Sequence, residues 1–182
     1  PVAVGSVERN SLDVAAAVAQ IAKGNPQAVI MATLYKPTAE FVRQMRKAGQ
    51  MPQFSTLSPI GADLLVAEMG AKEAHGIGIA QVMPYPWNDT TPVVKEFHKA
   101  IRAFTKQGNY SYYGIEGFLN AKLMAEALKK LGKDPTREKL VTTLESSNFD
   151  LGGYRVGYSP TNHNGSRFVD LTVLGRDGRV LR

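Results

Sequence analysis

Residues 25–54, NPQAVIMATLYKPTAEFVRQMRKAGQMPQF, carry the pattern that decides the fold. A turn-forming Asn-Pro pair opens the stretch, and a continuous apolar run follows over residues 28–32, which is typical of a strand covered on both faces in a parallel sheet. Pro37 begins an amphipathic helical pattern that ends at Gly49, and residues 54–57 are again strand-like. A strand, a helix and a strand in this order predict parallel pairing through a crossover helix.

The same alternation continues on both sides of this stretch. Residues 11–24 predict a preceding helix with Ser11 as its N-cap, residues 64–70 predict a short following helix, and residues 77–83 predict a third strand. The fold class is therefore α/β, a parallel sheet with flanking helices.

Beyond residue 83 the pattern changes. PYPWND, residues 84–89, contains two prolines and cannot form regular structure. Three amphipathic helical patterns follow without a strand between them. They carry more apolar surface than a thin sheet can cover, so we expect a further layer of structure, missing from this sequence, to cover them. The tail alternates, with Val169, Leu171 and Val173 on one face, and predicts antiparallel strands turned at Asp177-Gly178.

Composition favours an ordinary globular protein. The 182 residues are 43% hydrophobic and 21% charged, with a net charge of +6 and no cysteine. The basic residues are scattered among acidic ones, as on solvated helix faces, so we expect no nucleic-acid partner. The absence of cysteine excludes thiol catalysis and disulfides. The chain starts at Pro1 without a visible signal peptide, and we expect a processed or truncated start.

Catalytic motifs are missing. The sequence has neither a G-x-S-x-G nucleophile elbow nor a phosphate-binding P-loop. The histidines His75, His98 and His163 are far apart and lack partners at metal-ligand spacing. We therefore predict no metal, no cofactor and no enzymatic activity.

Polar and aromatic residues instead follow the ends of the predicted strands. Tyr35 follows the first strand, Ser58 the second, and Tyr85 the third. In parallel α/β sheets, ligands bind beyond the carboxyl ends of the strands, near the starts of helices. A tyrosine offers an apolar ring and a hydroxyl, which suits a small organic ligand.

Four stretches in order resemble the leucine/isoleucine/valine-type periplasmic binding proteins of ABC importers, which have a type I periplasmic-binding-protein fold. They are residues 25–54 above, GIGIAQVMPYPWNDTTPVVKEFHKAI (76–101), YSYYGIEGFLNAKLMAEALKKLGKDPTREKLVTTLE (110–145) and GGYRVGYSPTNHNGSRFVDLTVLGRDGRVL (152–181). No single motif is highly specific, but the ordered set covers essentially the whole chain. Family members are about twice as long, so the resemblance implies that this chain corresponds to their C-terminal part.

The resemblance also implies a division of the chain. Residues 1–83 would form the α/β segment of the C-terminal lobe, and residues 84–91 the hinge crossover. Residues 92–150 would be helices of the N-terminal lobe, and residues 151–182 closing strands that return to the C-terminal lobe.

In such proteins a solute closes two lobes like a hinge and is delivered to a membrane ABC permease from the periplasm. By position, the resemblance implies ligand contacts at Tyr35 and at Tyr113, which would face one another across the cleft, with Gln81 in the crossover. Amino-acid binders of the family place a carboxylate where Ser58 stands, and a serine cannot neutralise a desolvated ammonium group. We therefore expect a neutral or anionic organic solute to bind better than leucine.

Two alternatives stay open. A cytoplasmic ligand-sensing regulatory domain could have the same fold, and a signal peptide or a DNA-binding segment upstream would distinguish the two functions. The incomplete cleft also suggests a homodimer that covers the apolar side chains of Phe97, Phe104 and Phe118.

Overall fold

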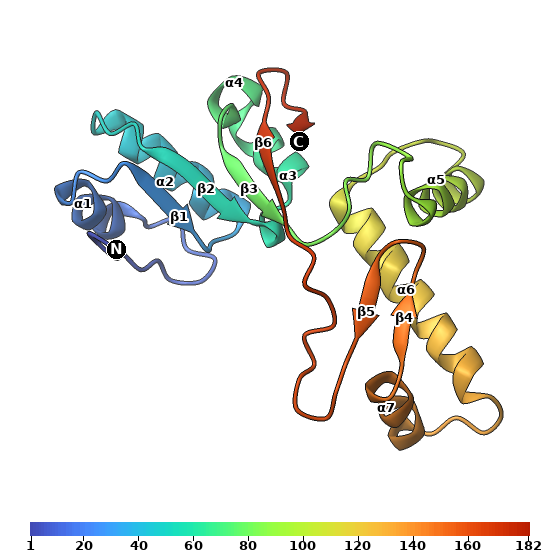
Figure 1. The fold of residues 1–182 in the computed structure, drawn as a ribbon. Coiled ribbons are helices and arrows are strands. Elements are labelled where there is room, and N and C mark those ends of the chain that lie inside the picture. The colour runs from blue at the N-terminus through green and yellow to red at the C-terminus, as the bar shows by residue number, and fades with distance from the viewer. The chain divides into compact units, whose positions relative to one another are not determined.

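The computed structural model describes residues 1–182, which form two compact units. Unit 1 comprises Pro1–Gln81 and Asp170–Arg182, and unit 2 comprises Val82–Val169 (Figure 1). The chain thus leaves unit 1 once and returns to it once. No helix is long and apolar enough to span a membrane.

Unit 1 is built on a five-stranded sheet in the order β1-β2-β3-β6-β7. The strands are β1 (Ala28–Met31), β2 (Gln53–Leu57), β3 (Gly78–Gln81), β6 (Asp170–Leu174) and β7 (Val180–Leu181). The first three strands are parallel, and β6 and β7 are antiparallel to their neighbours. The predicted α/β class is confirmed, with a mixed sheet instead of a purely parallel one.

The helices of unit 1 are α1 (Ala15–Lys23), α2 (Tyr35–Lys47), η1 (Ser58–Ile60), α3 (Ala62–Met69) and α4 (Ala71–Ala74). The strands β1, β2 and β3 are parallel and stand side by side in chain order. Because the crossover connections between parallel strands are right-handed, α2 and α3 lie on the same face of the sheet. The prediction that Ser11 caps the first helix is wrong, because the Ser11 hydroxyl accepts a hydrogen bond from the Asp13 N–H, at 3.0 Å, in the turn before the helix. The N-cap position is occupied by Val14 instead.

The two faces of this sheet differ in burial. Buried side chains on the helix-covered face belong to Val29, Met31, Phe54, Ile79 and Leu174. The opposite face, which we call the open face, carries the alternate residues of the same strands. Its large apolar side chains are Ile30, Leu57, Leu171, Val173 and Leu181, all of which are exposed.

This open face corrects one sequence prediction. Residues 28–32 were expected to be covered on both faces, but burial alternates along β1 and Ile30 is 78% exposed. Leu171 and Val173 share one face of β6, as predicted, and that face is the exposed one, because the buried residues of β6 are Thr172 and Leu174. The reason is that the helices of the chain cover one face of the sheet only.

Unit 2 packs three helices against a short hairpin. The helices are α5 (Pro92–Thr105), α6 (Tyr112–Leu131) and α7 (Arg137–Glu145), and the hairpin pairs β4 (Asn148–Asp150) with β5 (Arg155–Gly157). Phe97 of α5 is fully buried and shares one apolar core with Ile115 and Leu119 of α6 and with Phe149 and Val156 of the hairpin. The α6 helix starts where the Ser111 hydroxyl accepts the Gly114 N–H at 3.0 Å.

The hairpin changes one predicted boundary. Residues 151–182 were expected to return to the first lobe, but residues up to Val169 belong to unit 2 and the return starts at Asp170. The apolar side chains of Phe149, Leu151 and Val156 explain this, because they fill the core beneath α5 and α6.

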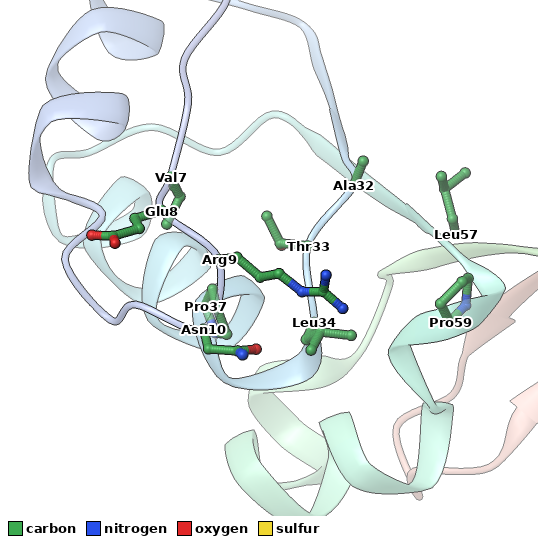
Figure 2. Close-up of a pocket in the computed structure, with 10 residues that line it drawn as sticks. All are labelled: Val7, Glu8, Arg9, Asn10, Ala32, Thr33, Leu34, Pro37, Leu57 and Pro59. Atoms are coloured by element: carbon green, nitrogen blue, oxygen red, sulfur yellow. The ribbon is translucent and has the colours of Figure 1, made fainter.

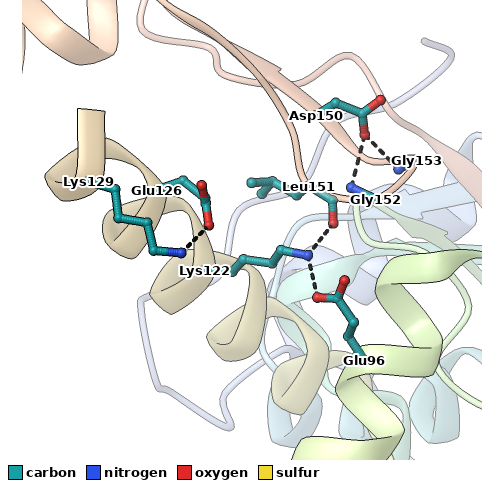
Figure 3. A network of polar contacts seen from close by, with 8 residues as sticks. All are labelled: Glu96, Lys122, Glu126, Lys129, Asp150, Leu151, Gly152 and Gly153. Atoms are coloured by element: carbon teal, nitrogen blue, oxygen red, sulfur yellow. Dashed lines mark hydrogen bonds and ion pairs between the residues drawn. The ribbon is translucent and has the colours of Figure 1, made fainter. Parts of the chain in front are cut away.

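A lysine connects the three parts of unit 2 (Figure 3). Lys122 of α6 forms an ion pair with Glu96 of α5, and its ammonium group also donates to the Leu151 carbonyl at 2.9 Å. Beside it, the N–H groups of Gly153 and Gly152 donate to Asp150 at 2.7 and 2.9 Å and lower the pKa of that carboxyl group. The turn of the hairpin is thereby fixed to both long helices.

The stripe proposed for pairing with a second copy is mostly internal. Phe97 is fully buried, and Phe118 packs against the same core. Only Phe104 is exposed among the three, so the sequence argument for a homodimer through this stripe is wrong for Phe97 and Phe118.

Candidate functional site

Unit 1 has a pocket at the carboxyl ends of β1 and β2, with a volume of about 330 Å³ (Figure 2). One wall is the loop after β1, Ala32–Leu34, together with Pro37 in the first turn of α2. Leu57 and Pro59 come from the end of β2. The facing wall is formed by residues 7–10. The location is the one at which parallel α/β sheets bind ligands.

Arg9 supplies positive charge to this pocket. Figure 2 shows its guanidinium group close to Thr33 and Leu34, whereas the carboxylate of the neighbouring Glu8 points away from it. Arg9 forms no ion pair with any carboxylate of the chain, although seven such pairs exist elsewhere. An unpaired guanidinium group in a concave site can receive a carboxylate with two parallel hydrogen bonds.

The loop that faces Arg9 is held in place by local hydrogen bonds. The Thr33 and Thr38 hydroxyl oxygens lie 2.6 Å apart, which ties the loop to the first turns of α2. On β2, the Thr56 hydroxyl donates to the Met31 carbonyl at 3.1 Å and joins the two strand ends. These hydrogen bonds connect the loop after β1 to α2 and to β2.

Two of the predicted site residues lie at this end of unit 1. Tyr35 is the first residue of α2, and Ser58 is the first residue of η1, directly after β2. Both are partly exposed, and both are neighbours in the chain of residues that line the pocket. The structure thus brings them to one end of the sheet, as the strand-end argument predicts.

Gln81 has a different environment. It is the last residue of β3, is only 2% exposed, and its amide donates to the Thr172 hydroxyl at 3.4 Å. The Thr172 hydroxyl donates in turn to the Ile79 carbonyl at 3.0 Å. This placement favours a role in joining β3 to β6 over direct contact with a solute.

Unit 2 contains an aromatic cluster of Tyr85, Trp87 and Tyr112. The rings meet edge to face, with centroids 5.1 Å apart for Tyr85 and Trp87 and 5.5 Å apart for Trp87 and Tyr112. Trp87 is 39% exposed, so its ring offers apolar surface that the cluster does not cover. Tyr113, the next residue on α6, is also exposed. Tyr85 and Tyr113 were predicted from the sequence.

Arg9 was not predicted from the sequence as a pocket residue, nor was the contact between the rings of Trp87 and Tyr112. Arg9 lies in a loop without a periodic pattern, so only its proximity to the end of a strand could have indicated it. The run YSYY at residues 110–113 was a visible signal, because Tyr112 directly precedes the predicted contact Tyr113. Tyr110 has another role, since it stacks on His98 with centroids 3.8 Å apart.

Two of the three histidines have structural partners. His98 is hydrogen-bonded to the Pro86 carbonyl at 2.7 Å, and His163 lies 2.8 Å from the Glu145 carboxylate. No three side chains of the metal-ligating types lie close enough together to hold an ion.

Comparisons with known proteins identify the family of the chain. A family model described as a periplasmic binding protein matches residues 2–179. No curated protein matches the chain. Among solved structures, a possible leucine/isoleucine/valine-binding protein from Rhodopirellula baltica is 29% identical with a TM-score of 0.88, and the match covers 98% of this chain and 49% of that chain.

Two further structures are similar. A substrate-binding periplasmic protein from Ralstonia solanacearum is 34% identical with a TM-score of 0.81, covering 95% of this chain and 50% of that one. An extracellular ligand-binding receptor from Verminephrobacter eiseniae is 32% identical with a TM-score of 0.79, covering 94% and 50%. The chain thus spans about half the length of these proteins.

Proposed function

Because the chain belongs to the periplasmic binding protein family, we propose that it binds a small organic solute and serves, in the periplasm, a membrane ABC permease. The observation that carries this proposal is the strand-end pocket of unit 1, which has the size and location of a small-molecule site.

We further propose that the solute is an anion, with a carboxylate as its charged group. Arg9 brings a positive charge into the pocket, and Ser58 leaves the second strand end without a negative one. Glu8 is the one carboxylate among the lining residues, and it points away from the Arg9 guanidinium group (Figure 2). An ammonium group beside Arg9 would therefore lose its hydration next to a like charge, which is costly. A carboxylate would gain charge-assisted hydrogen bonds worth about 1.5–3 kcal/mol.

Unit 2 has exposed aromatic surface of its own. The exposed rings of Trp87 and Tyr113 offer contact area to the apolar part of a solute, and Tyr85 supports Trp87 from within the cluster. In unit 1, we propose Tyr35 and Ser58 as solute contacts at the strand ends.

We propose binding without chemical conversion. The family model and the similar structures are those of binding proteins. The hydrogen bonds of the His98 and His163 rings go to the Pro86 carbonyl and the Glu145 carboxylate and not to a hydroxyl nucleophile.

Calorimetric titration of the full-length protein with three related compounds tests the solute class. They are leucine, 4-methylpentanoate, which lacks the ammonium group, and isopentylamine, which lacks the carboxylate. We expect 4-methylpentanoate to bind most tightly and isopentylamine least. Tighter binding of leucine than of 4-methylpentanoate would refute the proposed anionic class.

Variants test the residues. Arg9→Gln should weaken binding of 4-methylpentanoate about tenfold to a hundredfold, because one charge-assisted contact is lost. Arg176→Gln is the control, since it removes the same charge from the exposed turn between β6 and β7. Tyr35→Ala should cost about 1–3 kcal/mol through lost ring contact and one hydrogen bond. Equal effects of Arg9→Gln and Arg176→Gln would remove Arg9 from the site.

A further inference from the structure

Asn164 is the only asparagine of the chain that a glycine follows. It lies in the segment 158–169, which connects β5 to β6, and its side chain is exposed. Every other asparagine precedes a residue that carries a side chain, as Asn162 precedes His163. The backbone nitrogen of Gly165 is therefore the one least shielded from the asparagine before it, because glycine has no Cβ atom.

The two groups that meet at this position are both free of hydrogen bonds. The Asn164 side-chain amide has no partner in the chain, and the Gly165 N–H has no acceptor. The side chain of Asn162 differs, since its Oδ1 atom accepts the Asn164 N–H at 2.9 Å. No existing hydrogen bond has to break before the Asn164 amide and the Gly165 nitrogen approach each other.

The glycine at position 165 is required by packing. A Cβ atom there would be 2.7 Å from the Tyr158 ring, which is closer than a side chain can approach. The Gly165 carbonyl also accepts the Gly157 N–H at 2.9 Å, which attaches the segment 158–169 to the end of β5. Any larger residue at position 165 would disturb this attachment, so the unhindered neighbour of Asn164 follows from the fold.

We propose that Asn164 is a deamidation site, at which the side chain converts spontaneously to isoaspartate and aspartate. The Gly165 nitrogen attacks the Asn164 Cγ atom. A C–N bond forms, the Cγ–Nδ2 bond breaks, and ammonia leaves with the proton of the Gly165 N–H. Water then opens the resulting succinimide at either carbonyl carbon, with its hydroxyl bound to carbon and its hydrogen to nitrogen. Each product has a carboxylate in place of a neutral amide.

The two products affect the fold differently. Opening at Cγ gives aspartate with an unchanged backbone. Opening at the other carbonyl gives isoaspartate, whose main chain runs through Cβ and Cγ and is longer by a methylene group. This insertion displaces Gly165, which has no spare room beside Tyr158. The hydrogen bond from Gly157 is then lost, and the segment 158–169 separates from β5. The inference does not depend on which solute the protein binds.

Peptide mapping of the full-length protein after prolonged incubation in its folded state tests the site. Trypsin cleaves after Arg155 and Arg167, and the peptide 156–167 contains both Asn162 and Asn164. We expect a mass gain of about 1 Da at Asn164, from the exchange of an amide for a carboxylate. The reaction should be faster at mildly alkaline than at neutral pH, because the attacking nitrogen must lose its proton. Asn162 should react at least about tenfold more slowly, a barrier difference of about 1.4 kcal/mol.

Two variants at position 164 separate the reaction from its consequences. Asn164→Gln keeps the amide but requires a larger ring, so the mass gain should disappear. Freshly prepared Asn164→Asp has the new charge on a normal backbone. Hydrogen exchange at the Gly157 amide should therefore become fast in the isoaspartate form of the wild type and stay slow in Asn164→Asp.

Three outcomes would overturn the inference. They are no mass gain at Asn164 in the folded protein, equal rates at Asn162 and Asn164, and an unchanged mass gain in Asn164→Gln. An isoaspartate form in which the Gly157 amide stays protected would refute the separation of the segment 158–169 from β5.

Discussion

Replacing Lys122 by methionine should destabilise unit 2 by about 2–3 kcal/mol. Methionine keeps most of the aliphatic stem but removes the ammonium group. The larger loss is the hydrogen bond to the partly buried Leu151 carbonyl, worth about 1.5–3 kcal/mol for a charged donor. The Glu96 side chain is 52% exposed, so its ion pair adds at most about 1 kcal/mol.

Lys129→Met is the matched control, since Lys129 lies on the same helix and pairs with Glu126 at 2.8 Å. Both partners are well exposed, so this change should cost no more than about 0.5 kcal/mol. Urea denaturation followed through Trp87, the single tryptophan, reports on unit 2 specifically. A Lys122→Met effect below about 0.5 kcal/mol, or one equal to that of Lys129→Met, would refute the connecting role of Lys122.

Three further predictions concern other residues. Saturation with 4-methylpentanoate should shift the fluorescence emission of Trp87, and an unchanged spectrum on calorimetrically proven binding would place the cluster outside the site. The Gly153 and Gly152 N–H groups lower the folded-state pKa of the Asp150 carboxyl group. The contribution of this carboxylate to stability is therefore present above its unfolded pKa and lost as the pH falls through its folded pKa. The urea midpoints of the wild type and of Asp150→Asn should differ at pH 7 and converge in acid. Phe97→Ala should cost about 3–5 kcal/mol, whereas exposed Phe104→Ser should change stability by less than about 0.5 kcal/mol and leave the sedimentation coefficient unchanged.

The order of elements in unit 1 could be read from the sequence because its signals are local. Pro37 at the start of a helix and Gly49 after its end bound α2 closely, and the apolar run before them marks β1. Asp177-Gly178 likewise identifies the last turn, where Gly178 has a φ of 78°. Local chemistry fixed these features, so no knowledge of tertiary contacts was needed.

The burial of the two sheet faces could not be read in the same way. Ile30 and Val29 are equally apolar, and only the position of the helices decides that one is exposed and the other buried. The same limitation explains why Arg9 was missed, because its entry into the pocket depends on the path of residues 7–10 across α2. Tyr35 and Ser58 were found since the ends of parallel strands meet by topology alone.

The insertion of unit 2 between β3 and β6 has a consequence for how the protein is made. Gln81 and Asp170 are register partners, yet the whole of unit 2 is synthesised between them. While the ribosome translates unit 2, β3 is therefore the edge strand of a nascent sheet of β1, β2 and β3, and the edge that later pairs with β6 has no partner. Such edges favour association with other chains, so the period before Leu174 emerges is the one in which a chaperone would protect this protein most.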